Sequence, residues 1–349
     1  FKPGHILFGK RNWYLRRLAV AQRDGICSAH MLVLEPIEGK STKEFLPLLM
    51  FSDDFYEKAL MVSAGSMSPT IKWKDLAPLE FLIPSITEQE EILSITHKID
   101  HTISNSQNLL EKTKNYMISR RELLLTRGIG HTKFKKAPWY YGKTIEIPED
   151  WETCTIKDIL VNQNSGFHTN NFKEDGTNIV GVVDFYTNTK IDGQIFRFVE
   201  LSQKDKNEYS LQKNDLLFVE RSLVFSGIGK TLIVTKKGEG TCFGGNIRRF
   251  SVNTKCNAQF LYFLLETALL RKSIISRSFV STITGITSKE YFQTKIFIPP
   301  LPEQQKIISI LSNINEQITQ QQSHLNNLKV LRKSILNSKL TKEKTNVTN

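Results

Sequence analysis

The sequence contains one glycine-rich stretch whose residue types could bind a phosphate. Gly227-Ile228-Gly229-Lys230-Thr231 has the Gly-Lys-Thr end of a nucleotide-binding loop. That loop also needs a glycine five residues before Gly229, where this chain has Val224. The stretch therefore does not predict nucleotide binding. A basic loop that contacts DNA phosphates through its backbone N–H groups is the better interpretation, because glycine lets the backbone approach a phosphate closely.

Two further sets of residues have spacings that occur in nucleases or metal sites. Asp24 followed by Glu38-Gly39-Lys40 has the order of a nuclease triad, and His97 with His101 could bind a metal ion from one helix face. Neither set recurs in the internal repeat described below. The sequence also lacks Asn-Pro-Pro-aromatic, Gly-x-Ser-x-Gly and His-Glu-x-x-His motifs. It therefore predicts no catalytic residue, no bound metal and no cofactor.

The composition indicates a basic globular protein. Lys and Arg number 47 against 35 Asp and Glu, a net charge of +12. Hydrophobic residues make up 40%, which excludes wholesale disorder, and no apolar run reaches the roughly 18 residues of a membrane span. The four cysteines have no disulfide or metal spacing, which favours a reducing, cytoplasmic location. The charge favours a nucleic-acid partner, although an ordinary basic surface would carry it too.

The chain contains an internal repeat. LIPSITEQEEI (82–92) aligns with FIPPLPEQQKI (297–307) at an offset of 215, and this offset gives 19 identities between residues 19 and 103. Average composition would give roughly five by chance. Leu7-Phe8 and Arg11 match Leu217-Phe218 and Arg221 at an offset of 210, so the intervening loops differ in length. The same alignment pairs Cys27 with Cys242, which predicts two equivalent core positions in strands.

The two copies are unequal in extent. The second copy begins near Trp151, and its counterpart falls at 151 − 210 = −59, before the first residue. We therefore expect the N-terminal part of the first copy to be absent from this chain. The predicted divisions are a first domain (1–86), a long helix (87–127), a linker (128–150), a second domain (151–301), a second long helix (302–340) and a basic polar tail (341–349).

Each copy ends in a long helix. Glu88 to Leu125 and Glu303 to Leu340 contain neither Pro nor Gly, and helices of this length span about 55 Å. Apolar residues at alternating steps of three and four predict a coiled-coil seam between the two helices, with either relative orientation open, although a helix lying along its own domain is an alternative. The predicted seam residues are Ile99, Ile103, Leu110, Leu311, Ile314, Ile318, Leu325 and Leu328.

The region between the helices has the pattern of a β-rich domain. Short apolar runs separated by Asn, Asp and Gly turns predict strands at 178–185, 215–220, 231–235 and 247–252, followed by a helix at 258–276. In the first copy, residues 6–8 predict a buried strand. The predicted fold class is α+β, with two repeated β-rich domains, the first truncated, joined by two long coiled-coil helices.

These motifs resemble those of the specificity subunit of type I restriction–modification enzymes. The resemblance rests on two Pro-x-x-x-Glu-Gln motifs that each open a long helix, on GIGHTKFK (128–135) with IPEDW (147–151), and on SGFHT (165–169) with the run LLFVERS…SGIGKT (216–231). It covers essentially the whole chain. The chain departs from the family pattern in its shortened first domain and in IPSITEQ, which stands in place of IPPLPEQ.

The resemblance implies a division of labour between subunits. Two target recognition domains would each bind one half of a bipartite, asymmetric site in double-stranded DNA. The two long helices would pair antiparallel, as two long antiparallel coiled-coil helices, and hold these domains a set distance apart. This chain would perform no catalysis itself. It would recruit two modification subunits that methylate adenine with S-adenosylmethionine, and through them restriction subunits that use ATP and Mg²⁺. No membrane partner is expected.

Loop residues of the two domains are the candidate DNA contacts. Basic side chains bind phosphates, whereas polar side chains can bind base edges in the major groove. The candidates in the second domain are Ser165, His168, Thr169, Asn170, Asn171, Arg221, Ser226, Lys230, Asn246 and Arg248. Those in the first domain are Lys10, Arg11, Asn12, Tyr14, Arg16 and Arg17.

Two other functions stay open on sequence alone. The chain could be the recognition part of a fused nuclease or methyltransferase, or a coiled-coil interaction scaffold without DNA recognition. A gel shift of the chain with its modification partner against mixed DNA would separate these alternatives.

Overall fold

A computed structural model describes residues 1–169, 171–279 and 284–340, and the chain divides into two compact units. One unit is Phe1–Glu111 together with the chain from Thr319 onward, and the other is Lys112–Ile318. Two long helices, α4 (Ile86–Arg127) and α10 (Leu301–Leu340), each contribute to both units. Among the described residues, no helix combines the length and apolar character needed to cross a membrane.

The first unit is built on a small antiparallel sheet. Its strand order is β2-β1-β3, and Phe8 on the central strand lies opposite Leu18 and Leu32. Ile6 and Phe8 pack with Phe55 and Ile71 in a buried cluster. The elements are β1 (Ile6–Gly9), η1 (Trp13–Leu15), β2 (Leu18–Val20), β3 (Met31–Leu34), α1 (Phe45–Met50), α2 (Asp53–Met61) and α3 (Trp73–Leu76).

The second unit holds a larger set of strands and short helices. Its elements are β4 (Phe134–Pro138), η2 (Tyr140–Gly142), β5 (Thr144–Pro148), β6 (Glu152–Thr155), α5 (Ile156–Ile159), β7 (Leu160–Ser165), β8 (Thr177–Val180), η3 (Val182–Tyr186), β9 (Lys190–Ile191), β10 (Arg197–Val199), α6 (Gln203–Tyr209), β11 (Leu216–Val219), β12 (Arg221–Ser222), η4 (Phe225–Gly227), β13 (Thr231–Val234), η5 (Lys236–Gly238), β14 (Cys242–Phe243), β15 (Ile247–Val252), α7 (Ala258–Leu265), α8 (Ala268–Ile275), β16 (Thr284–Gly285), α9 (Ser288–Phe292) and β17 (Lys295–Ile298).

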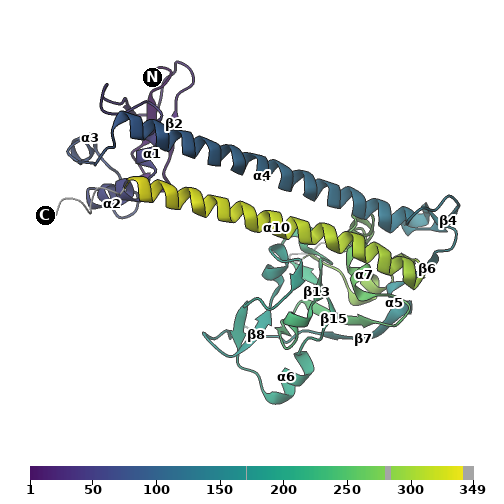
Figure 1. The fold of residues 1–349 in the computed structure, drawn as a ribbon. Coiled ribbons are helices and arrows are strands. Elements are labelled where there is room, and N and C mark those ends of the chain that lie inside the picture. The colour runs from purple at the N-terminus through teal and green to yellow at the C-terminus, as the bar shows by residue number, and fades with distance from the viewer. Residues whose placement is uncertain (170, 280–283, 341–349) are drawn as a thin grey trace. The chain divides into compact units, whose positions relative to one another are not determined.

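A five-stranded sheet, in the order β7-β15-β11-β13-β9, organises the second unit. All four residues of its central strand β11 are buried. Since successive side chains of a strand point to opposite sides, β11 is covered on both faces. Leu216 and Phe218 join one hydrophobic cluster, whereas Leu217 and Val219 join another. Helix α7 lies against β13 (Figure 1). The other paired strands of this unit form a second sheet, β10-β8-β14, and the two-stranded pairs β12-β16, β17-β6 and β4-β5.

The two units confirm the internal repeat. The order β2-β1-β3 in the first unit matches β13-β11-β15 in the second. A later segment of each unit bonds to the residue that follows the central strand: Ile71 N–H donates to Lys10 O at 3.0 Å, and Ile286 N–H donates to Glu220 O at 2.9 Å. These four residues are related by the two offsets found in the sequence.

The glutamine of each Pro-x-x-x-Glu-Gln motif explains why the motif recurs. Gln89 Nε2 donates to Lys40 O and Pro84 O at 2.8 and 2.9 Å, and Gln89 Oε1 accepts from Thr42 N at 3.0 Å. Gln304 makes the same three bonds, at 3.0, 2.9 and 2.8 Å, to residues exactly one repeat further on, Lys255, Pro299 and Asn257. Both side chains are fully buried. Each glutamine therefore ties the start of a long helix to backbone groups of its own domain.

The long helices pair antiparallel within each unit, as the family resemblance implies (Figure 1). In the first unit, Arg332 near the end of α10 donates to Asp100 near the start of α4 at 2.9 Å. In the second unit, the segment after α4 bonds to Glu303 at the start of α10. Four of the eight proposed seam residues are buried, namely Leu110, Leu311, Ile314 and Leu325, and the other four are half-buried.

Three local predictions were wrong. The apolar run 178–185 is a strand only to Val180, because the Asp184 carboxylate accepts from Gly181 N at 2.8 Å and starts the 3₁₀ helix η3. The helix at 258–276 is broken into α7 and α8, because buried Thr267 caps α8 by accepting from Leu270 N. Cys27 is exposed and lies outside any strand, whereas its sequence match Cys242 is buried in β14.

Candidate nucleic-acid interface

Three of the ten candidate DNA-binding residues of the second unit, Arg221, Ser226 and Lys230, lie on the loop between β11 and β13. This loop starts with β12, which pairs with β16, and then forms the 3₁₀ helix η4. The loop between β1 and β2 of the first unit occupies the equivalent position and also forms a 3₁₀ helix, η1. The same topology therefore presents one loop from each repeat.

The glycine loop does not offer free backbone N–H groups to a phosphate, contrary to the sequence interpretation. The N–H groups of residues 227 to 230 donate to Val224 O, Phe225 O, Val219 O and Gly227 O, respectively. Thr231 is buried and its hydroxyl bonds to Tyr291. The glycines serve packing instead: Gly229 has a φ of +62°, and a side chain there would collide with Ile274. Any phosphate contact must therefore come from side chains.

Four candidate side chains of the second unit are differently exposed. Arg221, Ser226 and Asn246 are exposed, and Lys230 is half-buried. Asn246 has a left-handed φ of 64°, and its carbonyl accepts from Glu220 N at 2.8 Å. This bond places the turn before β15 beside the start of the glycine loop.

Arg248 is held by groups of the protein. Its guanidinium forms an ion pair with Glu220 at 2.7 Å and donates to Ser165 Oγ at 2.8 Å and to Gln163 at 3.1 Å. Both Arg248 and Glu220 are largely buried in this pair. Arg248 and Ser165 therefore connect three strands, β7, β15 and β11, and orient the glycine loop, which the sequence did not foresee.

The segment after β7 lies beside the same edge. Phe167 N donates to Phe243 O at 2.9 Å, and Gly245 N donates to Phe167 O at 2.8 Å. His168 is exposed and its ring contacts Gly245. Thr169 Oγ1 accepts from Asn171 N at 3.0 Å, which forms a local turn. Asn170, also a candidate, lies outside the described residues.

The candidates of the first unit divide into free and engaged side chains. Arg17 and Tyr14 are exposed, and Lys10 is half-buried. Arg11 Nε donates to Ser68 Oγ, which itself donates to Asn12 Oδ1.

Arg16 is engaged more strongly. It pairs with Asp53 at 3.1 Å and donates to Phe51 O at 2.9 Å. Hydrogen bonds from Asn337 and Arg16 lower the pKa of Asp53 to about 2. Arg16 therefore has a local carboxylate partner, as Arg248 has in the second unit.

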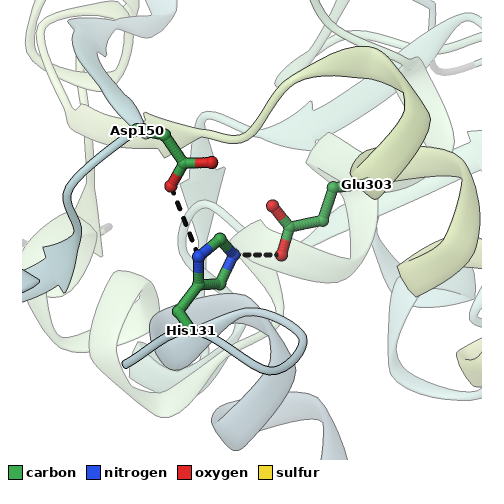
Figure 2. Close-up of side chains that lie close together, drawn as sticks. All are labelled: His131, Asp150 and Glu303. Carbon is green, nitrogen blue, oxygen red and sulfur yellow. Dashed lines mark hydrogen bonds and ion pairs between the residues drawn. The ribbon is translucent and has the colours of Figure 1, made fainter. Parts of the chain in front are cut away.

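One cluster of titratable side chains was not assigned from the sequence. His131, from the GIGHTKFK stretch, lies between Glu303 and Asp150, with Nε2 2.8 Å from Glu303 Oε1 and Nδ1 3.4 Å from Asp150 Oδ1 (Figure 2). Glu303 also accepts from Ile129 N at 2.9 Å and from buried Trp151 Nε1 at 3.1 Å. One glutamate therefore joins the segment after α4, the start of the second domain and the start of α10.

The geometry of this cluster fits a structural role. Its ligand atoms lie within 4.8 Å of one another, so the donor types are those that can hold a metal ion. The two carboxylates, however, face opposite nitrogens of one imidazole ring, and a single ion could take only one of these nitrogens (Figure 2). Nε2 hydrogen-bonds to Glu303 while Nδ1 faces Asp150, so one ring contacts both carboxylates without an ion.

Solved structures share this fold. A chain from a structure of complex assembly and conformational transition in a type I restriction–modification system superposes with a TM-score of 0.64 at 18% identity, over 97% of this chain and 82% of that chain. The type I restriction–modification system S subunit from M. genitalium gives a TM-score of 0.54 at 15% identity, over 97% of this chain and 83% of that chain. The fold is thus that of a restriction-system specificity subunit.

The sequence comparisons agree with the fold. Residues 4–115 and 148–329 match the family described as the type I restriction modification DNA specificity domain. The type I restriction enzyme MjaVIII specificity subunit of Methanocaldococcus jannaschii is 24% identical over 330 residues, which cover 91% of this chain and 74% of that protein. This chain belongs to the type I restriction modification DNA specificity domain family.

Proposed function

We propose that this chain is the DNA-recognition subunit of a type I restriction–modification complex and binds a bipartite, asymmetric site. The observation that carries the proposal is the repeated loop: the same strand order presents one basic loop from each unit. The chain would supply no catalytic group. Partner modification subunits would methylate adenine with S-adenosylmethionine, and restriction subunits would cleave with ATP and Mg²⁺.

The proposed contacts follow from exposure and charge. In the second unit, Arg221 and Lys230 bind phosphates, whereas Ser226, His168, Thr169, Asn171 and Asn246 are available for base edges. In the first unit, Arg11, Arg17 and Lys10 take the phosphate role and Asn12 and Tyr14 the base role. Arg16, Arg248 and Ser165 hold these loops in place through the bonds described above.

Binding to a selected DNA pool by the chain assembled with its modification partner tests this function. We expect enrichment of a two-part sequence, and Arg221→Ala should lower the slope of log affinity against log salt concentration by about one. A chain that assembles with its partner but enriches no sequence would instead be an interaction scaffold.

We also propose that the helix pair sets the spacing between the two half-sites. A heptad inserted after Glu111 and another after Ile318 would lengthen the pair by about 10 Å. At a rise of roughly 3.4 Å per base pair, the preferred spacer should grow by about 3 base pairs. An unchanged spacer in that double insertion would eliminate the spacing role while leaving DNA recognition intact.

A further inference from the structure

The glycine loop exposes a continuous run of large apolar side chains. Leu223, Val224 and Phe225 are 84%, 49% and 50% exposed. Single exposed apolar residues are common on protein surfaces, but runs of three or more are unusual unless they serve a function. We call Leu223–Phe225 the second apolar tip.

The equivalent loop of the first unit has the same property. Tyr14 and Leu15 on η1 are 43% and 48% exposed, between β1 and β2. We call Tyr14–Leu15 the first apolar tip. The two tips share no aligned identity, so the exposed apolar character recurs at this place in the fold through different residues. A chance exposure would have no reason to occupy the same loop in both copies.

The second apolar tip is held rigidly rather than left loose. Ser222 is buried, and its hydroxyl bonds to Tyr186 at 2.6 Å, to Val224 O at 2.7 Å and to Val224 N at 3.0 Å. Gly227 lies against Ser222 and Tyr186, where a side chain would not fit. A preorganised tip loses little conformational entropy when it inserts into a partner.

The first apolar tip is anchored by different bonds. Buried Trp13 donates to Ser63 Oγ at 2.7 Å, and Asn12 N donates to Pro69 O at 2.8 Å. Asn12 and Arg16, on either side of η1, both have left-handed φ values near 50°. The exposed side chains of this tip are therefore also presented from a fixed backbone.

Each apolar tip is next to positive charge. Arg221 lies two residues before the second tip, and Lys230 ends its loop. Arg11 and Arg17 lie on either side of the first tip. A surface that combines cations with apolar groups at its centre complements a polyanion whose interior is apolar, which is the character of duplex DNA with its stacked bases.

We propose that the two apolar tips insert against the bases of the two half-sites, Phe225 and Tyr14 stacking on base faces while the neighbouring arginines hold the backbone. This inference rests on the proposed DNA-recognition function. It adds Leu15 and Leu223–Phe225 to the candidate DNA contacts and gives Tyr14, already a candidate for a base edge, a stacking role. Because the tips differ in sequence, each half-site would meet a different apolar shape.

The test uses the full chain assembled with its modification subunit and a DNA that contains both half-sites. The double substitution L223S/F225S should weaken specific binding roughly 5- to 150-fold, the range for one lost base–aromatic stack. The salt slope should stay unchanged, because no cation is removed. Ile195→Ser, at an equally apolar and 74% exposed position outside the loop, should bind as the unchanged protein does.

A second variant gives a positive signal. Phe225→Trp retains an aromatic face, so it should keep the affinity, and its added tryptophan fluorescence should be quenched by target DNA but not by unrelated DNA. The pair Y14S/L15S should lose discrimination in the other half-site only.

Three outcomes separate the possibilities. Unchanged affinity for L223S/F225S, or an unquenched Phe225→Trp, would refute the insertion. Failure of L223S/F225S to assemble with the modification subunit in the absence of DNA would also refute it and identify the tip as a protein-docking surface. If the unsubstituted complex binds no DNA sequence specifically, the proposed function itself fails.

Discussion

Replacing Gln304 by leucine removes one of the two buried glutamines that tie the long helices to their domains. The substitution keeps the volume but deletes the bonds to Lys255 O, Pro299 O and Asn257 N. Each buried polar group left without a partner costs about 1–3 kcal/mol. Two of the three bonds are only partly buried, so water can compensate in part, and we expect a loss of about 2–4 kcal/mol in the free energy of unfolding.

Thermal unfolding of the full chain followed by circular dichroism measures the effect. A loss of this size in a unit of this length lowers the midpoint by about 5–15 °C. Hydrogen exchange adds a local readout, because the Asn257 amide loses its acceptor and should exchange faster. Gln305→Leu is the control, since Gln305 is exposed in the next position.

The repeat supplies a second case. Gln89→Leu should accelerate exchange of the Thr42 amide in the first unit and leave the Asn257 amide protected. Equal midpoints for Gln304→Leu and Gln305→Leu, with the Asn257 amide still protected, would show that these bonds do not stabilise the helix start and that the reasoning is wrong.

Three further predictions concern other groups. Glu303→Gln should destabilise the second unit more than Glu88→Gln destabilises the first in urea unfolding. Glu303 accepts from Ile129, His131 and Trp151, whereas the hydrogen bonds of Glu88 within the described part of the chain are to Ser85; equal effects would contradict this. The pKa of Asp53 is lowered to about 2, so its ionised form stabilises the first unit above about pH 4 and this contribution is lost as the pH falls toward 2. The Asp53 side chain is 34% exposed, so after solvent screening Asp53→Asn should cost about 1 kcal/mol at pH 7, with a difference that vanishes near pH 2 in acid titrations. Burial raises the pKa of Cys154 and Cys256 to about 12 and that of Cys242 to about 11. Cys27 is exposed, so it should be the thiol that a maleimide labels in the native protein at pH 7. Rapid labelling of any other cysteine would contradict the burial.

Sequence patterns predicted the features that depend on local periodicity. The strands β1, β11, β13 and β15 and the two long helices follow from apolar spacing and from the lack of Pro and Gly. The repeat followed from residues that recur at a fixed offset, whereas the antiparallel orientation of the helices was an implication of the family resemblance. Periodicity and recurrence are properties of short stretches of chain, so they can be recognised without knowing which distant residues are in contact.

The interface was less predictable because its chemistry depends on partners far apart in the chain. Nothing near Gly229 indicates that its N–H donates to Val219 O, and nothing near Arg248 indicates its pair with Glu220. An interpretation from residue types alone therefore overestimated the number of backbone N–H groups that the glycine loop could offer to a phosphate. One feature of the sequence does indicate a long-range contact. Both motifs have a glutamine at the start of the long helix, and this recurrence suggests a hydrogen bond that is common to the two domains.

Comparison of the two copies distinguishes the residues that stabilise the domains from those proposed to contact DNA. The bonds that are the same in both copies involve backbone groups and buried side chains, as with Gln89 and Gln304 or the backbone bonds of Ile71 and Ile286. The loops that differ are held by unlike local pairs, Arg16 with Asp53 in one copy and Arg248 with Glu220 in the other. A loop whose anchors are its own can change its exposed residues without disturbing the bonds that the domains share. Two domains of one fold can therefore bind two different half-sites, which is what an asymmetric DNA site requires.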